Sequence, residues 1–199
     1  MTSDQQPTSS TSNSLIRRAQ QADKIAWEKL TRLYSPVVYD WAKQAGLQPT
    51  DASDVMQNVF QTLTSRLHQF ERRNGADSFR GWLYTMTKNK VRDHFREKKQ
   101  RAQAFGGTAA QEMFQDLPES PPDEASSDGK SEISGVRQRA LELISGDFES
   151  RTWQSFYRTT VQGDAPQDVA DDLGISVWAV YKARSRVLTK LRTEFADLM

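Results

Sequence analysis

Residues 165–192 constrain the fold of this chain more than any other stretch, because they carry the spacing of two helices joined by a tight turn. Gly174 stands where a helix commonly ends in a left-handed residue. The hydroxyl of Ser176 is suited to cap the backbone of a following helix. A small residue at Ala170 and an apolar residue at Val180 let the two helices approach closely. This is the spacing of a helix-turn-helix unit.

The second helix of this unit is predicted to present a basic face. Residues 182–192 contain five Lys or Arg and no acid. In a helix-turn-helix unit the second helix lies in the major groove of DNA, where cations neutralise phosphates. This stretch alone leaves open an ordinary helical hairpin with a solvated basic face. The candidate DNA-contacting residues are Ser176, Trp178, Tyr181, Lys182, Arg184, Ser185 and Arg186.

Composition limits the class of protein. The 199 residues suffice for one large or two small domains, and a hydrophobic content of 36% is low for a single core. The chain has no cysteine, which excludes a disulfide framework and a thiolate metal site. No apolar run approaches the roughly 18 residues of a membrane span, and no secretory signal is recognisable. We therefore expect a soluble cytoplasmic protein without metal or other cofactor.

A net charge of +1 conceals an alternation of charge along the chain. Residues 80–101 hold eight basic and two acidic side chains. Residues 112–132 hold seven acidic side chains and one lysine. The sequence therefore contains a basic block, an acidic spacer and then the basic helix near its end.

Helical periodicity recurs along the chain without strand-like alternation, which predicts an all-α fold. We expect two small helical domains joined by a flexible acidic linker, with the helix-turn-helix in the C-terminal domain. Pro36 marks a kink or short break in the first helical region. Further helices are expected over residues 52–70, 79–101, 133–144 and 148–161. The predicted segments are a disordered N-terminus (1–13), an N-terminal domain (14–101), the linker (102–132) and a C-terminal domain (133–199).

Two predicted helices of the N-terminal domain carry candidate functional faces. The helix over residues 52–70 begins with acids and amides, which either complement the helix dipole or form a docking face for a basic partner. The helix over residues 79–101 interleaves aromatic rings with cations. That combination suits nucleic acid, since cations neutralise phosphates and rings stack on unpaired bases. A solvated basic helix is the alternative.

Three segments resemble, in the expected order, RNA polymerase sigma factors of the extracytoplasmic-function type in the sigma-70 family. DASDVMQNVFQTL at residues 51–63 resembles the helix that binds core polymerase. FRGWLYTMTKNKVRDHFREKKQR at residues 79–101 is similar to the helix that melts the promoter and contacts the −10 element. VADDLGISVWAVYKARSRVLTKLR at residues 169–192 is similar to the reader of the −35 element.

The resemblance implies a specificity subunit that has no active site and directs transcription initiation. Its expected partners are core RNA polymerase and promoter DNA, and the sequence leaves open whether an anti-sigma factor also binds. The resemblance assigns core-polymerase binding to Asp51, Asp54, Gln57 and Phe60. It assigns −10 DNA binding to Trp82, Lys88, Asn89, Arg92, Arg96 and Lys99. The −35 contacts fall on the seven residues named above, from Ser176 to Arg186.

Some positions depart from the family pattern. Asn58 stands where Glu is common, Thr64 lies near a usual Trp, and Trp178 replaces a common Gly. Tyr181 and Lys182 replace a frequent Lys–Ser pair. These departures leave open which −35 sequence the last helix reads.

Two other classes of protein are alternatives. A stand-alone helix-turn-helix regulator would bind paired half-sites as a dimer, and no spare apolar stripe for a dimer interface is evident. A nuclease would need clustered carboxylates or histidine ligands. The two histidines, His68 and His94, lie in different helical contexts without metal-ligand spacing.

Overall fold

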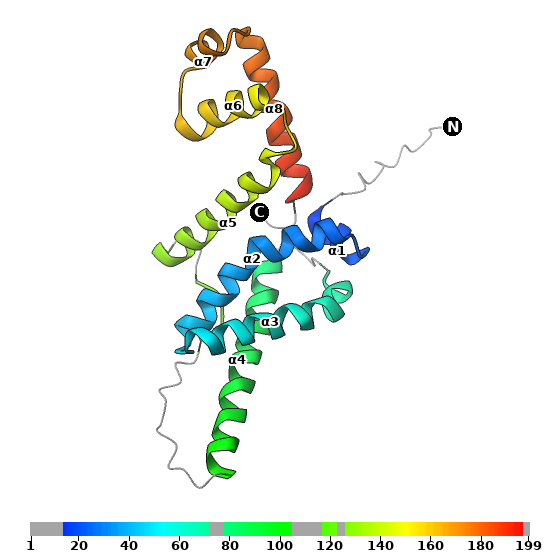
Figure 1. Ribbon diagram of the computed structural model, residues 1–199, viewed down its shortest axis with the longest axis vertical. Coiled ribbons are helices and arrows are strands. Elements are labelled where there is room, and N and C mark those ends of the chain that lie inside the picture. Colours follow the sequence, from blue (N-terminus) through cyan, green and yellow to red (C-terminus); the bar gives the residue numbers. More distant parts are fainter. Residues whose placement is uncertain (1–13, 72–77, 105–116, 123–125, 197–199) are drawn as a thin grey trace, which may run out of the picture.

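The computed structural model describes residues 14–71, 78–104, 117–122 and 126–196, with side chains up to Arg101 in the second of these ranges (Figure 1). Every regular element in these ranges is helical, and they contain no strand. The predicted all-α fold class is confirmed. The predicted disordered N-terminus and most of the predicted linker lie outside the described residues.

The helices follow one another in short steps along the chain. They are α1 (Leu15–Gln20), α2 (Lys24–Gln44), α3 (Pro49–Arg66) with a 3-10 turn η1 (Leu67–Gln69), α4 (Phe79–Ala104), α5 (Ser127–Ser145), α6 (Ser150–Tyr157) with a π-helical turn η2 (Arg158–Gln162), α7 (Pro166–Leu173) and α8 (Val177–Glu194).

Two helices differ from the sequence-based expectation. Helix α2 continues through Pro36 as one helix, so the short break that was one expectation there is absent. Helix α5 begins at Ser127, earlier than the expected 133, because the hydroxyl of Ser126 caps it by accepting from the Gly129 amide at 3.1 Å. The prediction followed apolar periodicity, which starts later than the polar capping signal.

Helices α1 to α4 enclose one apolar core. Trp41 of α2 is fully buried, and its ring meets Tyr84 of α4 edge-on at 4.9 Å between centroids. Tyr34 of α2 meets Phe79 of α4 in the same manner at 5.1 Å. Edge-to-face pairs add specific geometry to the burial of these large rings. Helix α4 is therefore fixed at its first turns, while its last turns extend beyond the bundle (Figure 1).

The C-terminal helices pack against this bundle. Helix α5 lies along α2, where Arg139 donates to the Leu33 carbonyl at 3.0 Å (Figure 1). Ile144 of α5 and Leu191 of α8 belong to the same apolar cluster as the residues of α1 to α4. The domain boundaries proposed from the sequence stay a prediction, since the described helices of both parts share this packing.

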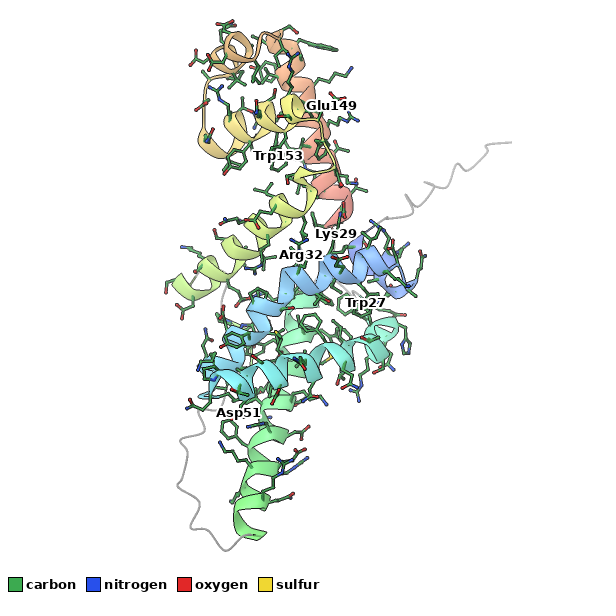
Figure 2. The ribbon with its side chains drawn as sticks, viewed as in Figure 1. Trp27, Lys29, Arg32, Asp51, Glu149 and Trp153 are labelled. Atoms are coloured by element: carbon green, nitrogen blue, oxygen red, sulfur yellow. The ribbon has the colours of Figure 1, made fainter. Side chains whose placement is uncertain are left out.

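A buried acid joins the end of α8 to α2. The side chain of Glu194 is 4% exposed and accepts from the Lys29 ammonium at 2.6 Å. Lys190 lies 3.5 Å from its second carboxylate oxygen. On the other side, Lys29 lies 3.8 Å from Asp147, which follows α5. This cluster of charges ties three parts of the chain together next to α1 (Figure 2 labels Lys29).

We expect Glu194→Ala to lower the free energy of unfolding by about 2 kcal/mol, because it leaves the largely buried Lys29 without its close partner. The measurement is urea denaturation followed by circular dichroism. The matched control is Glu97→Ala, which removes an exposed pair with Arg101 and should change stability by less than about 0.5 kcal/mol. Equal losses in both variants would contradict a structural role for the Glu194 cluster.

Candidate functional site

The segment from α7 to α8 has the geometry that its sequence requires. Gly174 adopts the left-handed conformation at φ 63°, which ends α7. The Ile175 amide then donates to the Ala170 carbonyl at 3.0 Å. Ser176 caps α8 by accepting from the Ala179 amide at 3.2 Å. The turn between the helices is thus held by backbone bonds on one side and by a side-chain cap on the other.

A small apolar cluster holds α7 against α8. Val169, Ala170 and Val180 are buried together, with Leu173 and Ile175 packed around them. This cluster is separate from the main core. The orientation of α8 relative to α7 is therefore set by local contacts.

An arginine that the sequence analysis did not single out braces this unit. Arg158 of the π-helical turn donates to Asp164 at 2.7 Å and to Asp172 of α7 at 2.9 Å. Hydrogen bonding to Asp164, and then to Asp172, raises the pKa of Arg158 above its ordinary value. Little in the sequence indicates these pairs, because both aspartates lie outside the helical turn that carries Arg158.

All seven candidate −35 residues on and before α8 are exposed. Trp178 is 69% and Tyr181 51% exposed, which is unusual for rings of this size. The Lys182 ammonium lies 5.0 Å from the centre of the Trp178 ring, within cation–π range. The first turns of α8 thus present a ring and cation to solvent, beside further polar side chains.

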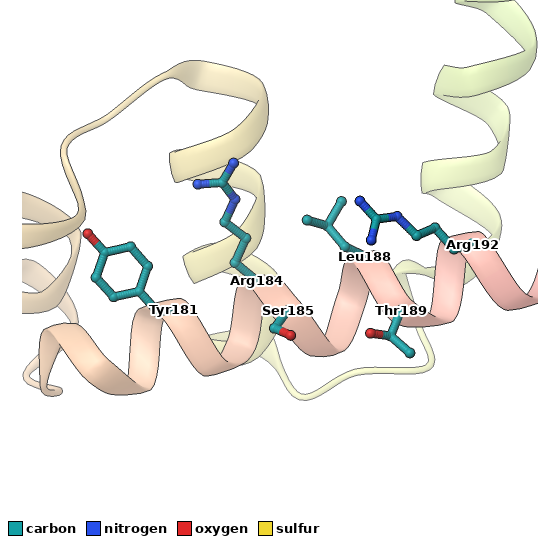
Figure 3. A pocket seen from close by; sticks show the side chains of 6 residues that line it. All are labelled: Tyr181, Arg184, Ser185, Leu188, Thr189 and Arg192. Carbon is teal, nitrogen blue, oxygen red and sulfur yellow. The ribbon is translucent and has the colours of Figure 1, made fainter.

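A shallow hollow runs along the same helix. It has a volume of about 250 Å³ and lies between Tyr181, Arg184, Ser185, Leu188, Thr189 and Arg192 (Figure 3). Figure 3 shows Arg184, Leu188 and Arg192 projecting from one side of α8. Arg192 is an addition to the predicted residues, and it shares this side with Arg184 because eight residues are close to two helical turns. The hollow therefore offers two guanidinium groups flanking an apolar side chain.

The candidate −10 residues of α4 divide into three groups. Asn89, Arg96 and Lys99 are exposed on the outer turns of the helix. Trp82 is half-buried and packs near the Phe70 ring at 5.2 Å between centroids, so its contribution is at least partly structural. Of the other two candidates, Lys88 lies on a side of α4 that another part of the chain covers, and Arg92 is exposed at the edge of that side.

That covered side carries Arg80, Tyr84, Lys88 and Arg92, spaced four residues apart. The Lys88 side chain is only 6% exposed and ends 2.6 Å from the Glu119 carboxylate. Arg92 lies 3.9 Å from the same carboxylate. Sequence reasoning missed Arg80 and Tyr84 as members of this set, although their spacing from Lys88 was a usable signal.

The candidate polymerase-binding residues lie on α3. Asp54 and Gln57 are exposed, and Phe60 is half-buried against the core. Asp51 instead faces α4, with His94 at 3.5 Å and Lys98 at 3.7 Å from its carboxylate (Figure 2 labels Asp51). The structure therefore leaves Asp54 and Gln57 as the accessible polar pair of this face.

Metal-ligand groups and membrane-spanning helices are both absent from the described residues. Those residues contain no group of three or more His, Cys, Asp or Glu placed to hold a metal ion. No helix within them combines the length and apolar character needed to cross a membrane.

Comparison with known proteins relates the chain to sigma factors. The family model for sigma-70 region 2 matches residues 30–101, which cover most of α2, all of α3 and most of α4. The RNA polymerase sigma factor NccH of Alcaligenes xylosoxydans xylosoxydans is 28% identical over 92% of this chain and 93% of its own. The RNA polymerase sigma factor CnrH of Cupriavidus metallidurans is 25% identical over 89% and 90%. Residues 30–101 thus match sigma-70 region 2, and the chain is similar to RNA polymerase sigma factors over about nine-tenths of its length.

Proposed function

We propose that this protein is a dissociable sigma factor that binds core RNA polymerase in the cytoplasm and directs it to promoters, without an active site of its own. The observation that carries the proposal is the pair of separate cationic faces on α4 and α8, in a chain similar to sigma factors over about nine-tenths of its length. A stand-alone regulator is less well supported, because both named relatives are sigma factors.

Helix α8 is the proposed reader of duplex DNA at the −35 element. The exposed side chains of Trp178, Lys182 and Arg184 rise from its first turns, which in helix-turn-helix proteins contact base edges. Arg184 has the donor fork that matches guanine. The rings of Trp178 and Tyr181 offer apolar contact to thymine methyl groups. Ser185 and Arg186 would contact phosphates at the rim.

Helix α4 is the proposed holder of the opened −10 strand. The exposed amide of Asn89 can hydrogen-bond an unpaired base, while Arg96 and Lys99 neutralise phosphates. Trp82 supports this helix from beneath, in contact with Phe70.

The exposed face of α3 is the proposed dock for core polymerase. Asp54 and Gln57 offer a carboxylate and an amide to a basic partner, and Phe60 lies next to them at the edge of the core. Asp51 contributes indirectly, because its contacts with His94 and Lys98 hold α3 against α4.

The docking proposal predicts that Asp54→Arg with Gln57→Ala weakens binding to core polymerase by at least tenfold, since a charge reversal at an interface costs on the order of a few kcal/mol. The measurement is a titration of labelled core enzyme. The matched control, Glu142→Arg with Gln138→Ala, changes the same residue types on the exposed face of α5 and should retain binding. Undiminished affinity in the α3 variant would exclude this face.

The division between α4 and α8 predicts opposite responses to a pre-melted promoter. Asn89→Ala should impair opening of a duplex promoter and recover on a template with a −10 bubble, because its contact is to an unpaired base. Arg184→Ala should stay impaired on both templates, with a loss of about 1–3 kcal/mol for one base contact. Permanganate footprinting of unpaired thymines measures both.

Controls for this pair come from α5. Gln138→Ala removes an exposed amide and Arg137→Ala an exposed cation, each away from the two proposed DNA faces. Both should open the promoter as the unchanged protein does. Rescue of Asn89→Ala and Arg184→Ala to the same degree would contradict the division of labour.

A further inference from the structure

One side of α4 is occupied by a distant part of the same chain. Arg80, Tyr84, Lys88 and Arg92 follow one another at four-residue steps and so share a face. We refer to these four residues as the α4 stripe. Each of them contacts either residues 117–122 or Glu132 of α5.

Three residues of the stripe, Tyr84, Lys88 and Arg92, face residues 118 and 119. The Tyr84 hydroxyl donates to the Pro118 carbonyl at 3.1 Å. The Lys88 ammonium donates to the same carbonyl at 3.2 Å and to the Glu119 carboxylate at 2.6 Å. Arg92 lies 3.9 Å from that carboxylate. One backbone carbonyl and one carboxylate thus accept hydrogen bonds from Tyr84 and Lys88, and Arg92 lies near the same carboxylate.

The fourth residue of the stripe, Arg80, contacts the other end of the segment formed by residues 117–122. Arg80 donates to the Pro122 carbonyl at 3.0 Å and also binds the Glu132 carboxylate. The second oxygen of Glu132 accepts from the Trp41 indole N–H at 2.9 Å. The segment is anchored by Leu117, which is 5% exposed and belongs to the apolar core. Residues 117–122 are therefore held on α4 by one buried apolar side chain and a row of hydrogen bonds.

The acceptors in this contact resemble those of a DNA backbone. A DNA strand would offer the stripe the same kind of acceptor, anionic oxygens, that Glu119 and Glu132 supply. Lys88 cannot serve both at once, because its side chain is already 6% exposed beneath the segment. Glu119 itself is 90% exposed, and a pair with one exposed partner is weak enough to exchange.

We propose that residues 117–122 with Glu132 act as an internal competitor, which occupies the α4 stripe until a single DNA strand displaces it. This rests on the proposed role of α4 in holding the −10 strand. Asn89, Arg96 and Lys99 remain open and make the first contacts. Lys88 joins them only when the segment leaves, and Arg92, which is already exposed, then exchanges Glu119 for the strand. Any partner that draws the segment away from α4 therefore raises the affinity of the protein for the strand.

The test compares two double variants of the full-length chain. Glu119→Gln with Glu132→Gln removes the two charges that face the stripe and keeps an acceptor for Trp41. The control, Asp128→Asn with Glu142→Gln, removes two exposed acids whose hydrogen bonds lie within α5. Fluorescence anisotropy measures binding of each to a fluorescein-labelled oligo(dT) single strand.

We expect the first variant to bind about three- to tenfold more tightly than the unchanged protein, since two ion pairs no longer oppose displacement. The control should bind at most about twofold more tightly. Lys88→Met adds a further check, because Met retains the aliphatic stem. It should cancel much of the gain in the Glu119→Gln, Glu132→Gln background, because the ammonium that the double variant exposes is then missing.

Two results would contradict the competitor proposal and leave the proposed role of α4 intact. One is an equal gain in the test and control variants, and the other is a gain that Lys88→Met leaves intact. In either case a loss of binding in Arg96→Ala with Lys99→Ala would still support α4 as the strand-binding helix. If that variant binds the strand as well as the unchanged protein does, the proposed role of α4 fails and the competitor proposal fails with it.

Discussion

The carboxylate of Glu132 links α5 to both α2 and α4. It binds Arg80 of α4 and accepts from the indole N–H of the fully buried Trp41 of α2. Three helices from distant parts of the sequence therefore meet at one side chain. A buried indole N–H and a half-buried guanidinium would each be costly without an acceptor, and a single carboxylate satisfies both.

Burial of charge recurs where distant parts of the chain meet. Lys29 and Glu194 join α2 to α8, while Lys88 lies beneath Glu119. Such pairs add little net stability compared with apolar packing, but they are specific in geometry. They hold the C-terminal helices against the bundle in one orientation. In that orientation the exposed face of α8 and the outer turns of α4 both remain open to solvent.

The α7–α8 unit depends less on the rest of the molecule. Its apolar cluster is local, its turn is set by Gly174, and Arg158 braces α7 from the preceding turn. A unit of this kind keeps its shape if the contacts between α8 and α2 change. For a sigma factor that property is useful, because the proposed readers of the −10 and −35 elements have to engage separate stretches of one promoter.

The sequence by itself determined the all-α fold class, the turn at Gly174, the cap at Ser176 and the resemblance to sigma factors, because each depends on local spacing or on short motifs. It also predicted which residues of α8 are exposed, since one face of that helix is apolar. Tertiary structure alone decided that Asp51 pairs with α4, that Lys88 is covered by residues 118 and 119, and that Glu194 is buried against Lys29. These pairs join residues far apart in the chain, and periodicity along one helix carries no information about which distant acid or carbonyl comes to lie beside a cation.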